Sequence, residues 1–282
     1  MDETVSGFEV LKKGNREVIT DFYIDTDVSS EPDGLKFKVF IRLNAKRGVT
    51  FKNISFLHCV FDGCYFNNCV FDSCDFTGCR FISSNFHQSS FAGCKFEFAT
   101  FERSQLDDDI LVSEAPKEEN LRMHFARSLR MNYQQIGNAK AVNKAISIEL
   151  EATSSYLYKS WRSGETYYRK KYPGLINNIA QFLKWSTFWI LDFIWGNGES
   201  IPKLLRSILL SVIMIAVYDS NVQGNLLNVG FYWNSFQISP AIFLGVLSPH
   251  SYSLAALSII TGMRFISIAL LTALLVKRFS RR

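Results

Sequence analysis

This chain of 282 residues contains six cysteines, which are its most reactive side chains. Neighbouring cysteines are separated by five residues or a multiple of five, whereas zinc sites use closely spaced CxxC pairs. The spacing therefore predicts no metal site and favours buried free thiols, which pack like small apolar side chains. A chain that returned on itself every twenty residues would bring some of them close together, so disulfides are geometrically conceivable. The six positions are Cys59, Cys64, Cys69, Cys74, Cys79 and Cys94.

The other titratable side chains show no pattern that is typical of catalysis. The four histidines lie in different segments, at His58, His87, His124 and His250. They form no HExxH motif and no Ser/His/Asp spacing, and the chain has no glycine loop of the phosphate-binding type. The sequence therefore predicts that the protein is not an enzyme, with no catalytic residues, no metal and no cofactor.

Phenylalanine recurs at every fifth residue through the segment that holds the cysteines, with a small residue two places before each ring. This period fits neither a helix nor a strand, so the simplest geometry is a square coil with one ring pointing inward from each side. Stacked at the usual inter-strand spacing, the repeats give three turns and a rod about 15 Å tall. The predicted core positions are Phe51, Phe56, Phe61, Phe66, Phe71, Phe76, Phe81, Phe86, Phe91, Phe96, Phe101 and Leu106.

This pattern resembles the pentapeptide-repeat family over residues 49–108. The resemblance implies a right-handed quadrilateral β-helix, a fold that presents a surface or spaces other domains and has no shared active site. We expect the β-helix over 49–110, after an N-terminal segment, 1–48. Within that segment, Leu35–Leu43 alternates apolar and polar residues and predicts a strand that caps the open end of the coil.

Two helical parts are expected after the coil. Over 111–174 apolar residues recur at helical spacing, and Gly137 and Asn138 predict the turn of an antiparallel helical linker. Over 175–199, clustered Trp and Phe residues predict an interfacial helix in the plane of a membrane, because Trp prefers the headgroup level. A third membrane span is the alternative for this segment.

Two apolar segments in the last part of the chain, Ile201–Tyr218 and Leu254–Val276, are each about long enough to span a bilayer. The loop between them contains no lysine or arginine, whereas basic residues precede the first segment and follow the second. The positive-inside rule then predicts that both termini and the coil are cytoplasmic. We therefore expect 200–282 to be an all-α two-span domain in the bacterial inner membrane, and attribute the net charge of +5 to anionic lipid rather than nucleic acid.

The segment between the two spans, 229–249, is too apolar for a solvated loop, and Pro240 in its middle favours a re-entrant half-helix and turn. With its flanking spans it resembles the two-transmembrane pore-loop channels, which assemble as tetramers around a central pore; FYWNSF at 231–236 stands where that family has its pore helix. A TVGYG-like filter is missing, so potassium selectivity is not expected. The candidate pore or constriction residues are Pro240, Phe243, Gly245, Pro249, Gly262 and Arg264.

Arg264 is the one charged residue within the second apolar segment, and its role has two interpretations. It lines a pore, where it would repel cations, or it pairs with backbone carbonyls or with Asp219.

Three functions follow from this organisation. The first is an oligomeric membrane channel or pore, with a tetramer favoured, whose cytoplasmic coil senses or scaffolds an unknown protein partner. The second is a non-conducting scaffold anchored in the lipid bilayer. The third, DNA mimicry by the coil, expects a strongly acidic outer face. It is disfavoured by the outward residues Lys52, Arg80, Lys95 and Arg103, and no nucleic-acid partner is expected.

Overall fold

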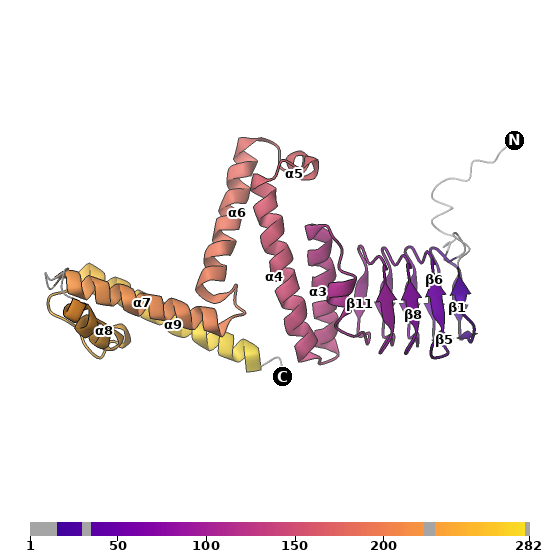
Figure 1. Cartoon of the computed structure of the whole chain (residues 1–282), viewed down its shortest axis with the longest axis horizontal. Helices are drawn as coiled ribbons and strands as arrows, with labels where there is room; N and C mark the ends of the chain where they lie inside the picture. The colour runs from indigo at the N-terminus through magenta and orange to yellow at the C-terminus, as the bar shows by residue number, and fades with distance from the viewer. Residues whose placement is uncertain (1–15, 30–34, 223–228, 280–282) are drawn as a thin grey trace. The chain divides into compact units, whose positions relative to one another are not determined.

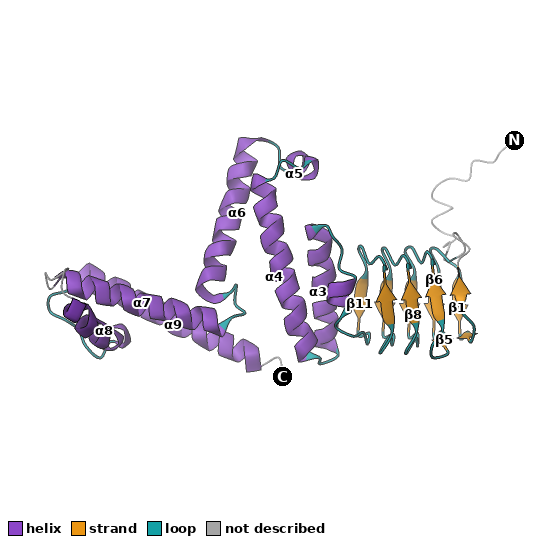
Figure 2. Cartoon of the chain, viewed as in Figure 1, coloured by secondary structure: helices purple, strands orange, loops and turns teal. Residues whose placement is uncertain are grey.

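The computed structural model of the chain describes residues 16–29, 35–222 and 229–279 (Figure 1). The chain divides into two compact units, Met1–Lys159 and Ser160–Arg282. Figure 2 shows that the strands lie in the N-terminal part of the first unit and that helices follow them.

The strands of the first unit stack in parallel and form a β-solenoid. They are β1 (Val18–Thr20), β2 (Tyr23–Ile24), β3 (Val28–Ser29), β4 (Val39–Ile41), β5 (Asn44–Ala45), β6 (Thr50–Lys52), β7 (Val60–Asp62), β8 (Val70–Asp72), β9 (Arg80–Ile82), β10 (Ser90–Ala92) and β11 (Thr100–Glu102). One sheet has the order β1-β4-β7-β9-β11, a second has the order β10-β8-β6-β3, and β2 pairs with β5. Phe61 pairs with Phe81, and Phe81 with Phe101, so one turn takes the predicted twenty residues.

The solenoid begins earlier in the chain than the five-residue pattern indicates. β4, which lies within the expected capping strand Leu35–Leu43, is paired on both sides, with β1 and with β7. It is therefore an internal strand and does not cap the open end. The register gives the reason: Ile19 pairs with Phe40, and Phe40 with Phe61, so these levels are 21 residues apart and the period of five is broken.

The phenylalanine rings fill the interior of the coil. Rings one turn apart stack almost in parallel, with centroids 5.1 Å apart for Phe56 and Phe76 and for Phe76 and Phe96. Rings on neighbouring sides meet edge to face, as Phe76 does with Phe71 and with Phe81 at 5.6 Å. Both arrangements are favourable for aromatic pairs, so each ring contributes contact energy beyond the burial of its area.

A left-handed backbone conformation recurs at the residue two places after each ring, which turns the chain at the corners of the coil. Most of these residues are not glycine, although positive φ disfavours other residues. At Gly78, with φ of +70°, glycine is also required by space, because an added Cβ would lie 2.2 Å from the His58 ring. The positions are Asn53, His58, Gly63, Asn68, Ser73, Gly78, Ser83, Gln88, Gly93, Phe98 and Arg103.

The small residue before each ring links one turn to the turn beneath it. The Cys79 thiol donates to the Phe56 carbonyl at 2.8 Å, and the Ser84 hydroxyl donates to the Phe61 carbonyl at 3.2 Å. Cysteine and serine thus make the same contact with a carbonyl 23 residues earlier, which explains why either residue can occupy this position. All six cysteines are buried and free.

Burial raises the pKa of four of these thiols. It raises the pKa of Cys64 and of Cys69 from 9.0 to about 11, and that of Cys79 well above 9.0. The pKa of Cys94 is raised first by its hydrogen bond with the Cys74 thiol and then by burial, so these two residues stack as the twenty-residue turn predicts.

The stability of the coil should therefore depend on pH in the alkaline range. A thiol whose pKa is higher in the folded than in the unfolded chain stays neutral in the fold, so stability is constant below pH 9 and falls as pH rises toward 11. Urea midpoints measured across this range should show the fall. The double variant Cys64→Ser/Cys69→Ser should show a smaller one, and an equal fall would contradict this account.

Two long helices follow the coil. After the single turn of α2 (Ile110–Ser113), α3 (Glu119–Gln135) and α4 (Ala139–Arg162) form an antiparallel hairpin. Gly137, with φ of +74°, lies in the turn between them, where the sequence predicts it. Arg127 and Arg130 of α3 both contact the Glu149 carboxylate at 2.8 Å.

The face of α3 that meets the last turn of the coil carries hydrogen-bond acceptors at helical spacing. Ser128 Oγ accepts from the Phe101 N–H at 2.9 Å, Asn132 Oδ1 from Ser104 at 2.7 Å, and Gln135 Oε1 from Arg103 at 2.9 Å. These N–H groups would pair with a further coil if there were one. The helix therefore caps the open end of the solenoid, which protects its unpaired edge.

Asn132 is the central residue of this cap, because its amide also donates to the Ser104 carbonyl at 2.7 Å and it is fully buried. Asn132→Leu should destabilise the first unit by about 2–4 kcal/mol, since it leaves two buried backbone groups without partners. Gln135→Leu removes one acceptor at an exposed position of the same helix and should cost less. Urea denaturation followed by thiol labelling compares the two variants, and equal losses would show that the buried hydrogen bonds of Asn132 do not carry the cap.

The second unit is helical. Its helices are α5 (Thr166–Lys171), α6 (Gly174–Trp195), α7 (Ile201–Val222), α8 (Val229–Leu244) and α9 (Leu254–Phe279). Among the described residues, α7 and α9 are the two helices long and apolar enough to cross a membrane. They are antiparallel, because Lys277 near the end of α9 contacts the Glu199 carboxylate at 2.5 Å and the Gly198 carbonyl at 3.1 Å, just before α7 begins. The basic ends of the two helices therefore lie together.

Candidate functional site

Arg264, the charged residue within α9, meets the C-terminal end of α8. Its Nε donates to the Phe243 carbonyl at 2.8 Å. Gly245 ends the helix with φ of +79°, and an added Cβ there would lie 2.2 Å from Arg264 Nη1. A guanidinium at this end satisfies a helix carbonyl and offsets the negative end of the helix dipole. The structure thus brings together three of the six candidate residues, Phe243, Gly245 and Arg264. Pairing with a backbone carbonyl is one of the two roles that the sequence suggests for Arg264.

The other three candidates lie elsewhere in the unit. Pro240 is exposed within α8, and the helix continues through it. The prediction that this proline breaks the segment is therefore wrong. The Pro249 carbonyl accepts from the Tyr252 N–H at 3.2 Å. Gly262 faces open space on α9, since an added methyl group would meet no atom within 4 Å.

A buried carboxylate ties three elements together near the end of α7. Asp219 is only 3% exposed, and its two oxygens accept from Ser235 Oγ of α8 at 2.7 Å and from the Tyr252 hydroxyl before α9 at 3.0 Å. The sequence contains the signal for this cluster, because Asp219 is the only acidic residue after Glu199. Its hydroxyl partners carry no such signal.

The course of α8 relative to α7 follows from these contacts. Ser235 lies beside Asp219, while Ile242, seven residues later, packs in one apolar cluster with Val212. The helices are therefore antiparallel, and α8 follows α7 for about 10 Å, back to its middle. Tyr252 then contacts Asp219 again, so the segment after Gly245 returns to the level from which α8 came.

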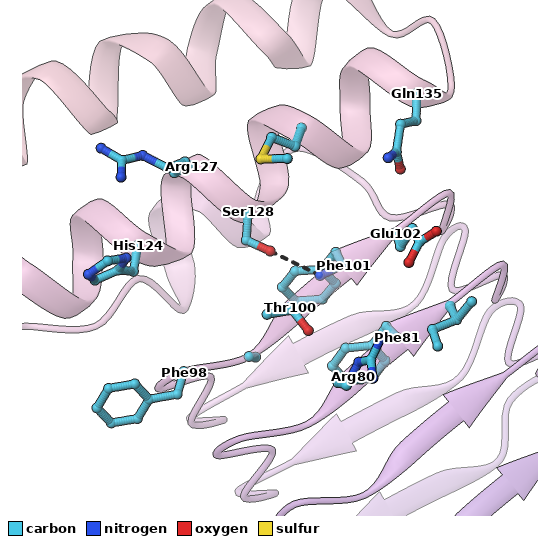
Figure 3. Close-up of a pocket in the computed structure, with 13 residues that line it drawn as sticks. Arg80, Phe81, Phe98, Thr100, Phe101, Glu102, His124, Arg127, Ser128 and Gln135 are labelled. Atoms are coloured by element: carbon cyan, nitrogen blue, oxygen red, sulfur yellow. Dashed lines mark hydrogen bonds between the residues drawn. The ribbon is translucent and has the colours of Figure 1, made fainter.

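A groove of about 630 Å³ lies in the first unit, between the last strands of the coil and α3 (Figure 3). Arg80, Thr100 and Glu102 line it from the coil, and His124 and Arg127 line it from α3. Ser128 points toward Phe101, to whose N–H it is bonded, so its hydroxyl is engaged in the cap. The groove is lined by cationic, acidic and apolar side chains. Within the described ranges, no group of three His, Cys, Asp or Glu residues is arranged to hold a metal ion.

Comparison with known proteins bears on the coil. Residues 47–89 match the family model of pentapeptide repeats in nine copies. A solved pentapeptide repeat protein from the thylakoid lumen of Arabidopsis thaliana is 21% identical, over 31% of this chain and 72% of that one, with a TM-score of 0.16. No curated protein matches the sequence. The family match, the repeat spacing and the parallel stacking agree that the solenoid contains pentapeptide repeats over residues 47–89.

Proposed function

We propose that this chain is a membrane protein in which α7 and α9 span the bilayer and the pentapeptide-repeat domain lies in the cytoplasm. The support is the exposure of these helices, because only 22% and 11% of their most apolar stretches are buried, whereas a core helix of a soluble protein is mostly covered. Lys203 and Arg206 begin α7 and Lys277 and Arg278 end α9, so the basic residues gather at one end of the antiparallel pair. That end faces the cytoplasm by the positive-inside rule.

In this placement α8 is a re-entrant helix. It enters from the outer side beside Asp219 and ends near the middle of α7, and the chain returns to the outer side at Tyr252. A lone helix end inside a bilayer needs partners for its last carbonyls. Arg264 and the left-handed turn at Gly245 supply them.

The function that this arrangement supports best is an oligomeric pore, with a tetramer favoured. The observation that carries it is the contact of Phe243, Gly245 and Arg264 at the inner end of α8. In the proposed placement this end lies near the middle of the bilayer, where pore-loop proteins narrow their path. The Arg264 guanidinium keeps its positive charge when it donates to the Phe243 carbonyl. A ring of these groups at that depth disfavours cations, so we expect the pore to favour anions.

Two measurements test the pore: the symmetry of the particle in nanodiscs reports the oligomer, and ion flux in liposomes reports conduction. A fourfold particle with flux is the expected result, and Arg264→Gln should move the reversal potential toward cation permeation, with Lys203→Gln as the control at the membrane surface. A monomer or dimer without flux would overturn the pore.

The second candidate function is a non-conducting scaffold held at the membrane. It is favoured by the groove beside α3, whose charged and apolar lining offers a protein-binding surface on the cytoplasmic domain. A chain without flux that still retains a cytoplasmic partner, and loses it in the variant Arg80→Glu/Arg127→Glu, would support this function over the pore.

A further inference from the structure

The helix α6 carries most of its aliphatic side chains on the face that the protein leaves uncovered. Residues on this face recur at helical spacing, and Ile176 is 84% and Trp189 is 55% exposed. The helix of a water-soluble protein shows the opposite order, with its apolar stripe toward the core. The uncovered face is formed mainly by Leu175, Ile176, Ile179, Leu183, Trp189 and Ile190.

The opposite face of α6 holds polar side chains that the protein does cover. Gln181 is only 5% exposed, and the Asn178 side-chain oxygen accepts from Arg169 at 2.8 Å. Asp192 pairs with Lys203 of α7 at 2.7 Å. The hydrogen-bonding side of the helix is therefore used inside the unit, and the water-avoiding side is presented outward.

Contacts at the C-terminal end of α6 connect this face to the membrane level. The Arg206 guanidinium lies 4.4 Å over the Phe193 ring, and Ser207 Oγ donates to the Ile194 carbonyl at 2.8 Å. Both partners are in the first turns of α7, where a spanning helix enters the bilayer. The end of α6 thus lies at the surface of the membrane if α7 crosses it.

The charged residues near the apolar face identify the kind of surface that it fits. Lys184 is exposed in the middle of α6, and Lys170 and Lys171 are exposed just before it. A lysine in the middle of a spanning helix would lie in hydrocarbon, which is costly, whereas in the headgroup layer it meets lipid phosphates. Exposed Trp189 also prefers that layer.

We propose that the outward face of α6 lies in the plane of the bilayer and docks into the headgroup layer of an anionic membrane. This inference rests on the membrane placement proposed above. It adds to the two spans a second lipid contact, which holds the start of α7 and the preceding chain at the cytoplasmic surface.

Single cysteines carrying an environment-sensitive fluorophore test this placement, because the six native thiols are buried and stay unlabelled in the folded protein. The full chain is placed in vesicles of phosphatidylethanolamine and phosphatidylglycerol with lipids that carry a quencher near the headgroup or deep in the acyl chain. Leu183→Cys reports the apolar face of α6, and Lys184→Cys, one residue on and also exposed, is its matched control. Ile213→Cys, exposed near the middle of α7, reports the span.

We expect position 183 to lose fluorescence mainly to the shallow quencher and position 213 mainly to the deep one. Position 184, which faces the phosphates and water, should lose less to the shallow quencher than position 183 and almost nothing to the deep one. Quenching at 213 without quenching at 183 would overturn the inference and leave the span intact, with a second protein copy then covering the face. Deep quenching at both 183 and 184 would overturn it in favour of a third span. Loss of quenching at 213 would instead remove the membrane placement itself.

Discussion

Replacing Phe76 with alanine is expected to destabilise the pentapeptide-repeat domain by about 3–5 kcal/mol, the usual range for a fully buried phenylalanine. The Phe76 ring stacks between the rings of the turns on either side and meets two more at the corners. The coil resists collapse into the cavity, because hydrogen bonds tie each side to the sides of the turns above and below it. The loss should therefore lie toward the upper end of that range.

The native cysteines provide the measurement, since all six lie in the coil and are buried there. Thiol labelling at increasing urea concentration reports unfolding of this domain in the full chain. Phe98→Ala is the matched control, because Phe98 is 64% exposed and should change stability by less than about 0.5 kcal/mol. A similar shift of midpoint for the two variants would show that the interior ring ladder does not carry the stability of the coil.

The second large effect is expected at Asp219. Asp219→Ala removes the acceptor for two hydroxyls and should destabilise the packing of α8 on α7 by about 2–5 kcal/mol, since each buried donor left unpaired costs roughly 1–3 kcal/mol. Asp219→Asn keeps one acceptor oxygen and should cost less. Hydrogen exchange of the segment 229–252 in detergent or nanodiscs should rise in the alanine variant.

A double-mutant cycle separates the hydrogen bond from general packing. Tyr252→Phe removes one hydroxyl that donates to Asp219 and should be costly alone, yet add little in the Asp219→Ala background. Val217→Ala, at an exposed position on the same helix, is the control for loss of side-chain volume. Additive effects of Asp219→Ala and Tyr252→Phe would show that the carboxylate does not hold the two elements together.

The sequence by itself determined the coil from Phe51 onward, because one ring must return to the interior on every five-residue side. It also determined the turn at Gly137 and the two long apolar helices, since these depend on local composition and spacing. The additional N-terminal turns were hidden, because a register of 21 residues breaks the period while backbone pairing still continues the stack.

Only the tertiary structure decided which side chains cap the end of the coil and which pair inside the second unit. Asn132 and its neighbours on α3 cap the coil through contacts with residues about thirty positions earlier, which no local pattern marks. Asp219 meets Ser235 and Tyr252 only because α8 folds back along α7. The outward apolar face of α6 likewise depends on which side its neighbours cover. Local periodicity follows from the backbone, whereas these partnerships arise from chain segments that meet only after folding.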